Sequence, residues 1–161
     1  MRLALYQPDI PQNTGTILRL AACLGVPVEL IEPAGFDASD RTLRRAGLDY
    51  LAHTDLTRHA SFEAFQDWRR ACGLRLVLLS SGGSAPYHGF KFKSGDVLML
   101  GRESAGVPPA VRASTDCSVR IPMRVGLRSL NVAVAAAMVL GEALRQTGRL
   151  DALAQLAAPP G

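Results

Sequence analysis

The sequence predicts a single α/β domain built on a mainly parallel sheet flanked by helices. Short apolar runs typical of strands alternate along the chain with segments of helical periodicity. Three of these runs, 74–79, 97–100 and 119–121, read as strands covered on both faces. Each leads into a loop rich in glycine, serine or proline, and open parallel sheets bind ligands outside the carboxyl ends of their strands. The sequence therefore predicts a binding site where these loops meet.

The chain begins with a predicted strand at 3–6, and a helix with regularly spaced apolar residues follows it. Asn13 or Thr14 is the expected N-cap of this helix, because short polar side chains accept hydrogen bonds from its first N–H groups. Gly25 is the expected end of the helix. The second predicted strand covers 28–31.

Two further helices are predicted in the first half of the chain. The first is basic and covers 40–45. The second covers 61–72 and places Phe62, Phe65 and Trp68 on one face.

The segment from 129 to 141 is the most distinctive helix of the sequence, because it carries no charge and is mostly alanine and valine. Such a helix must be buried, either in the core or against a second subunit. It is shorter than the roughly 20 residues that cross a bilayer, so we expect no membrane segment. Ser129 stands in the expected N-cap position and Asn131 is a polar residue close behind it. A basic loop leading to this helix start indicates either a ligand site or ordinary capping of a core helix.

Composition fits one domain covering residues 1–161, with an Ala/Pro-rich tail from about residue 153 that we expect to be flexible. The net charge is +4, and of 18 basic residues only Lys91 and Lys93 are lysines. Arginine suits phosphate recognition, so a polyanionic partner is plausible, although a GC-rich genome gives the same bias.

Three widely spaced cysteines indicate neither a disulfide framework nor a metal site. The three histidines also lack metal-ligand spacing, so no metal is expected. Free thiols and the absence of a secretion signal predict a cytoplasmic protein. The sequence also lacks the common nucleotide-binding motifs. No G-x-G-x-x-G follows the first predicted strand, and the segment 101–106 lacks the Lys-Ser/Thr of a P-loop.

Three ordered motifs nevertheless resemble those of the SPOUT RNA 2′-O-methyltransferases. They are Q-P-D-I-P-Q-N-T-G-T-I-L-R at 7–19, L-G-R-E-S-A-G-V-P at 100–108, and I-P-M…R-S-L-N at 121–131. The segment L-R-R-A-G-L-D-Y at 43–50, with no added domain, is similar to the branch that methylates the wobble nucleotide of tRNA, cytidine or uridine 34. The likeness covers essentially the whole chain. Three residues depart from the pattern: Arg102 stands where the family usually has Pro, Ser104 where it has Thr, and Gln12 where a third Pro is common.

This resemblance implies a SPOUT fold with a C-terminal trefoil knot and a homodimer whose active site is completed at the interface. It implies S-adenosylmethionine as methyl donor and the ribose 2′-OH of tRNA position 34 as acceptor. Two alternatives remain open. One is a 2′-O-methyltransferase acting at another tRNA or rRNA position, and the other is a non-catalytic protein that binds RNA or nucleotide.

The resemblance also implies site residues. The cofactor-binding positions are Leu79, Gly101, Ile121, Met123 and Ser129, and the catalytic positions are Asn13, Arg19, Glu103, Ser129 and Asn131. A guanidinium stays protonated, so we expect Arg19 to bind a phosphate and stabilise the developing alkoxide rather than act as a base. Glu103 is expected to fix Arg19 or Asn13, and Ser129 with Asn131 to position the ribose. A purely structural Arg19–Glu103 pair is the alternative.

Overall fold

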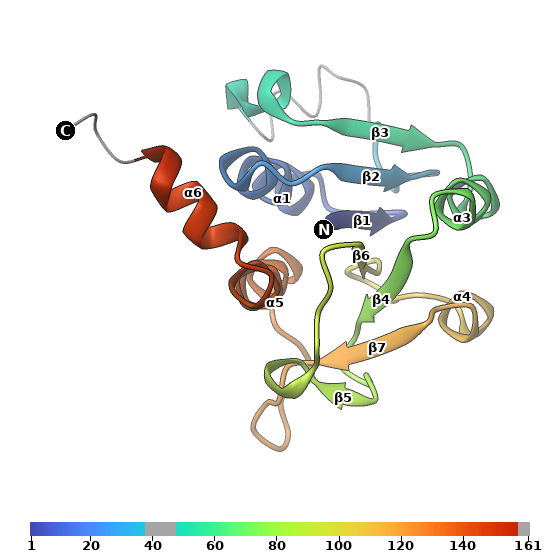
Figure 1. The fold of residues 1–161 in the computed structure, drawn as a ribbon. Coiled ribbons are helices and arrows are strands. Elements are labelled where there is room, and N and C mark those ends of the chain that lie inside the picture. The colour runs from blue at the N-terminus through green and yellow to red at the C-terminus, as the bar shows by residue number, and fades with distance from the viewer. Residues whose placement is uncertain (38–47, 158–161) are drawn as a thin grey trace.

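The computed structural model describes residues 1–37 and 48–157, which form one parallel sheet between two layers of helices (Figure 1). The seven strands lie in the order β3-β2-β1-β6-β4-β7-β5, and every neighbouring pair is parallel. The strands are β1 Arg2–Tyr6, β2 Val28–Ile31, β3 Leu56–His59, β4 Arg75–Leu79, β5 Ala85–Pro86, β6 Asp96–Leu100 and β7 Cys117–Arg120. The α/β class and the mainly parallel sheet predicted from the sequence are confirmed.

Helices cover both faces of the sheet, with α1, α5 and α6 on one side and α3 and α4 on the other (Figure 1). Their bounds are α1 Pro11–Leu24, α3 Phe62–Ala71, α4 Pro109–Ala113, α5 Val132–Gln146 and α6 Arg149–Ala157, with 3₁₀ turns η1 Leu48–His53 and η2 Tyr87–Gly89. Alternate residues of β1 point into the two layers: Leu3 and Leu5 pack with α1 and α5, whereas Ala4 and Tyr6 pack with α3. None of the helices within 1–37 and 48–157 is long and apolar enough to span a membrane.

Helix α1 begins earlier than the sequence predicted. Its N-cap is Ile10, which makes no side-chain capping bond, and Pro11 occupies the first helical turn. Proline suits this place because its missing N–H would have no partner there. The prediction of Asn13 or Thr14 as N-cap is therefore wrong, and both residues lie inside the helix. The predicted end is confirmed, since Gly25 has a left-handed φ of 59°.

Helix α5 begins later than predicted. Its N-cap is Asn131, whose side-chain oxygen accepts hydrogen bonds from the N–H groups of Ala133 at 2.9 Å and Val134 at 3.3 Å. Ser129 lies two residues upstream in the irregular loop, so its assignment as N-cap is wrong. The consequence is that Ser129 keeps its hydroxyl for other partners, while Asn131 is tied to the helix start.

The apolar face of α5 is only partly covered by this chain. Ala136, Val139 and Leu140 are completely buried against the sheet and α1. On the opposite side Val134 is 51% exposed and Met138 is 39% exposed. The core thus covers one face of α5 and leaves apolar side chains on the other face exposed.

Several elements were not predicted, and each has weak sequence signals. Among the strands within 1–37 and 48–157, β3 pairs only with β2, and two of its four residues are exposed and polar rather than apolar. Strand β5 has only two residues, and α4 only five. Helix α6 includes the start of the predicted flexible tail. The basic helix predicted at 40–45 lies outside the described residues, and the threading of the C-terminal segment into a knot stays a prediction.

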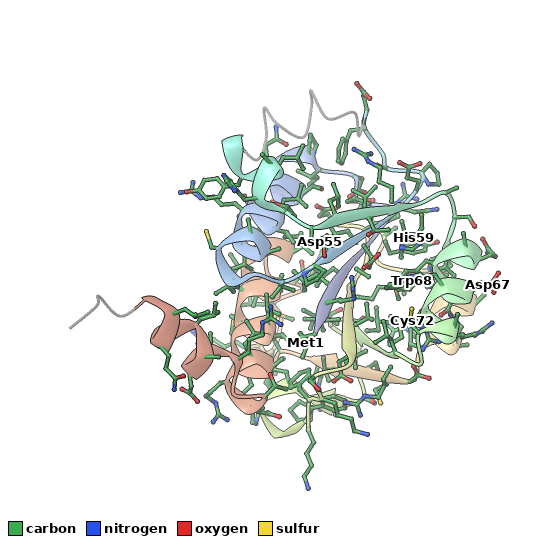
Figure 2. The ribbon with its side chains drawn as sticks, turned by 45° about the horizontal axis from the view of Figure 1, so that its top comes forward. Met1, Asp55, His59, Asp67, Trp68 and Cys72 are labelled. Atoms are coloured by element: carbon green, nitrogen blue, oxygen red, sulfur yellow. The ribbon has the colours of Figure 1, made fainter. Side chains whose placement is uncertain are left out.

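The carboxylate of Glu29 is completely buried on the α3 side of the sheet. It accepts a hydrogen bond from Arg2 Nη1 at 2.7 Å, and its second oxygen lies 2.7 Å from His59 Nε2. Figure 2 shows His59 next to Trp68, whose ring centroid lies 5.1 Å away. A buried charge without such partners is strongly destabilising, so loss of either partner of Glu29 would weaken the β1–β2–β3 edge of the sheet.

The loop between β4 and β5 lies directly on β7, and Gly83 makes this possible. A Cβ atom at Gly83 would come within 2.2 Å of the carbonyl carbon and oxygen of Val119. The neighbouring Ser84 N–H donates to Ser118 Oγ at 3.0 Å, which fixes the loop at the carboxyl edge of the sheet.

We predict that Gly83→Ala destabilises the protein by about 1–3 kcal/mol, the usual range for overpacking a close contact. Urea unfolding followed by circular dichroism measures this change. Gly89→Ala is the matched control, because a Cβ at Gly89 meets no atom within 4 Å. Equal unfolding midpoints for the two variants would contradict the assigned contact.

Candidate active site

A cleft of about 420 Å³ opens where the loops after β4, β6 and β7 meet the starts of α1 and α5. All five predicted cofactor positions line it: Leu79, Gly101, Ile121, Met123 and Ser129. Four of the five predicted catalytic positions also line it, namely Asn13, Glu103, Ser129 and Asn131. The three loops that the sequence predicted to converge therefore do form one cavity.

A directed chain of hydrogen bonds joins three of these residues. The side-chain oxygen of Asn131 caps α5, so its Nδ2 donates to Asn13 Oδ1 at 2.9 Å. Asn13 Nδ2 in turn donates to Glu103 Oε1 at 3.2 Å. Because each amide has one end already committed, the orientation of both asparagines is determined by their neighbours.

Asp9 completes this network; it lies within the first motif but was not among the predicted site residues. The N–H of Asp9 donates to Glu103 Oε2 at 3.1 Å, and the N–H of Glu103 donates to Asp9 Oδ1 at 3.0 Å. Both the N–H and the hydroxyl of Ser104 donate to Asp9 Oδ2. The loop after β1 and the loop after β6 are thereby tied together by reciprocal side-chain to backbone bonds. Two local signals could have indicated Asp9: it is an acidic residue just beyond a strand end, and it lies within the first motif.

The two carboxyl groups differ in their affinity for a proton. Hydrogen bonds with Glu103 and Ser104 hold the pKa of Asp9 well below its usual range. Burial, followed by the hydrogen bond with Asp9, raises the pKa of Glu103. The pKa values of two neighbouring carboxyl groups move apart in this way because ionising both groups at once is unfavourable. Asp9 therefore carries the stable negative charge of the pair.

The loop after β6 is a tight turn closed on itself. Arg102 and Gly106 exchange two backbone hydrogen bonds of 2.9 and 2.8 Å. A Cβ at Gly101 would lie 2.7 Å from the carbonyl carbon of Gly106, so only glycine permits this closure. The turn aims the Arg102 side chain at the cleft, where Nε lies 3.9 Å from Asp9 Oδ2.

Two arginines hold the loop after β4, and neither was singled out from the sequence. Arg112 on α4 donates to Ser80 Oγ at 2.5 Å and to the Gly82 carbonyl at 3.3 Å. Arg120 at the end of β7 donates to the carbonyl oxygens of Gly83 at 2.7 Å and Ser84 at 2.9 Å. Both contacts join distant parts of the chain, so no local pattern could have indicated them.

Arg19 is the one predicted catalytic residue that the fold does not bring into the cleft. It is exposed on α1, and its guanidinium lies over the ring of Tyr50, 4.7 Å from the centroid. Within residues 1–37 and 48–157 it forms no ion pair with Glu103, which binds Asn13 instead. The alternative of a buried structural Arg19–Glu103 pair is therefore wrong.

The same described ranges contain no group of three or more His, Cys, Asp or Glu arranged to hold a metal ion.

Comparison with known proteins agrees with these features. A tRNA (cytidine(34)-2′-O)-methyltransferase of Beijerinckia indica subsp. indica is 66% identical over 148 residues, which are 92% of each chain. A relative with the same name from Ancylobacter novellus is 57% identical over 148 residues, covering 92% of this chain and 94% of its own.

Among solved structures, one from work on the 2-OH methylation of C/U34 on tRNA superposes with a TM-score of 0.84 at 46% identity, covering 90% of this chain and 94% of that chain. The SpoU methyltransferase AviRb from Streptomyces viridochromogenes, in complex with AdoMet, gives a TM-score of 0.81 at 32% identity and covers 91% of this chain but 57% of its own. The model of the SpoU rRNA methylase family matches residues 1–141. These matches confirm the resemblance indicated by the three motifs, and the chain belongs to the SpoU rRNA methylase family.

Proposed function

We propose that the protein transfers a methyl group from S-adenosylmethionine to the ribose 2′-OH of nucleotide 34 of tRNA, a cytidine or a modified uridine. The observation that carries this proposal is identity over nearly the full length with relatives named for cytidine 34. Length supports the same choice: this chain covers 92% of such a relative but only 57% of AviRb. A tRNA substrate would also make the cytoplasm the site of action.

The cleft fits S-adenosylmethionine in size and in the chemistry of its walls. Its volume of about 420 Å³ lies within the usual range for small-ligand sites. Side chains of Leu79, Leu100 and Ile121 provide apolar walls suited to an adenine ring, and backbone groups near Gly101 and Met123 provide polar contacts. When bound, S-adenosylmethionine supplies an electrophilic methyl group on its sulfonium. A related SpoU methyltransferase solved with AdoMet supports this ligand.

The chain's own residues supply the groups that a ribose hydroxyl needs. Asn13 and Asn131 are held in fixed orientations by Glu103 and by the start of α5, so they can position the ribose without reorganisation. The Ser129 hydroxyl, free of the capping role, is available for the same task. The proton of the 2′-OH would leave to a phosphate oxygen or to water, while a fixed cation stabilises the developing alkoxide.

We propose a homodimer in which Arg19 acts in the cleft of the partner subunit. The exposed apolar side chains Val134 and Met138 lie on the open face of α5. Two further exposed apolar residues, Ile10 and Leu130, line the cleft itself, so the apolar surface reaches the rim of the site. A second subunit on this surface would close the cleft and cover an otherwise costly apolar patch. Arg19, which lies outside its own cleft, is then free to complete the neighbouring one.

The direct test of the function is nucleoside mass spectrometry. We predict that purified protein, S-adenosylmethionine and a tRNA anticodon stem-loop yield 2′-O-methylcytidine at position 34. A stem-loop with deoxycytidine at that position is the control and should give no product, because it lacks the acceptor hydroxyl. Methylation at another position would favour the first alternative. Calorimetric binding of S-adenosylmethionine without any methylated product would favour a non-catalytic protein.

Mixed dimers test the role of Arg19. We predict that Arg19→Ala keeps its affinity for S-adenosylmethionine but methylates about 10²–10³-fold more slowly, the scale for losing one charge-stabilising donor. Glu103→Ala should be inactive because the cleft network is lost. In an equal mixture of the two chains, heterodimers contain one intact site, so activity should return to roughly a quarter of wild type if subunits exchange randomly.

The control for this experiment places Val134→Glu in both chains, because an unpaired charge in an apolar contact blocks association. Activity should then fail to return, and sedimentation should show monomers that keep the native circular dichroism spectrum. Full activity of folded Arg19→Ala, or no recovery in mixtures shown to contain dimers, would contradict the assignment.

A further inference from the structure

Arg102 is a cation in the cleft whose hydrogen-bonding capacity is unused. Its Nε atom is buried and has no hydrogen-bond partner among residues 1–37 and 48–157. Its closest anion is Asp9, whose Oδ2 lies 3.9 Å from Nε, beyond hydrogen-bond distance. A guanidinium has five N–H donors, and in the part of the chain that the structure describes Arg102 donates none of them to a protein acceptor.

Asp9 is not the missing partner, because its carboxylate is already occupied. It accepts from the N–H of Glu103 and from both the N–H and the hydroxyl of Ser104. Its charge holds the guanidinium close by without satisfying its donors. Nε itself is closed to solvent, but the side chain as a whole is partly exposed, so an acceptor from outside the chain would meet the remaining N–H donors of the guanidinium.

The position of Arg102 is also well defined before any ligand binds. Two backbone bonds to Gly106 close the turn on which it stands, and Gly101 permits that closure. The side chain is 39% exposed, so one part of it lines the cleft and another part faces solvent. A preorganised cation at the mouth of a site can bind a ligand that extends beyond the cavity.

We propose that Arg102 binds a phosphate of the RNA backbone next to the target ribose, an inference that rests on the proposed methyl transfer to tRNA. A guanidinium recognises paired anionic oxygens, which a phosphodiester or the carboxylate of S-adenosylmethionine could both provide. The phosphate is favoured because Arg102 adjoins Asp9 and Glu103, on the side of the cleft that holds Asn13. Its partial exposure also suits a polymer better than a ligand enclosed in the cavity.

The first arm of the test compares Arg102→Gln and Arg102→Lys with Arg70→Gln. Arg70 is exposed near the end of α3, which leads to the amino-terminal edge of the sheet, so its variant removes the same charge far from the cleft. For Arg102→Gln we expect the Kd of the anticodon stem-loop to rise about tenfold and the slope of log K against log salt to fall by about 0.7, the value for one single-strand phosphate contact. Arg102→Lys should keep the slope but bind less tightly, because it lacks the planar fork.

The second arm replaces, one at a time, each phosphate flanking nucleotide 34 by a neutral methylphosphonate. Wild type should lose about tenfold in affinity at one of the two positions, whereas Arg102→Gln should lose nothing further there, since both changes remove the same contact. Calorimetry should give every variant a Kd for S-adenosylmethionine within about twofold of wild type, as expected of a residue that does not touch this ligand.

The outcomes separate this inference from the function on which it rests. Two results would overturn the inference. Arg102→Gln could match Arg70→Gln in RNA affinity and salt slope, or the affinity losses caused by Arg102→Gln and by the methylphosphonate could multiply. If Arg102→Gln binds S-adenosylmethionine less tightly while the salt dependence of RNA binding is unchanged, Arg102 binds the carboxylate of S-adenosylmethionine. This result would also overturn the inference. If wild type binds the stem-loop but methylates no RNA, the proposed function fails, while the binding cycle still decides the role of Arg102.

Discussion

The carboxyl group of Glu103 holds together three segments that the sheet alone would only bring near one another. One oxygen accepts from the Asn13 side chain and the other from the backbone of Asp9. Asn13 in turn accepts a hydrogen bond from the side chain of Asn131, the residue that caps α5. The loop after β1, the turn after β6 and the start of α5 therefore share one hydrogen-bonded network. Because the amides are oriented by their neighbours, loss of one member would disturb all three segments.

The sheet provides the frame for this network by fixing the strand ends. At its amino-terminal edge Arg75 and Asp96, directly opposite on β4 and β6, form two hydrogen bonds of 2.7 Å. The Asp96 side chain is completely buried, so this bidentate pair favours the observed register of β4 and β6. At the carboxyl edge Arg112 and Arg120 hold the loop after β4 through its carbonyl oxygens and one serine. The cleft is thus built on irregular loops with regular support beneath them.

The sequence was sufficient for the strands that are covered on both faces, because burial requires continuous apolar runs such as those of β4 and β6. It was not sufficient for β3, an edge strand whose middle residues face solvent. Both incorrect N-caps have a local cause: Pro11 can start a helix without a capping side chain, and Asn131 competed with the equally suitable Ser129.

Some residues of the site were predicted from the sequence and others were missed, for a similar reason. Every predicted site residue except Arg19 lines the cleft, whereas the roles of Asp9, Arg112 and Arg120 depend on partners that are 30 or more positions away in the chain. Only the fold brings such pairs together. The unused donors of Arg102 could likewise not be inferred from its sequence neighbours, since they depend on how fully Asp9 is occupied.

The hydrogen bonds that join Asn131, Asn13 and Glu103 imply that Asn13 and Asn131 act as one unit in the proposed methyl transfer. A double-mutant cycle on the single-turnover methylation rate, with Asn13→Ala, Asn131→Ala and the double variant, tests it most directly. We predict that the double variant is no slower than the slower single variant, because either change breaks the same series of hydrogen bonds. Rate losses that simply multiply would show that the two residues act independently and would contradict this prediction.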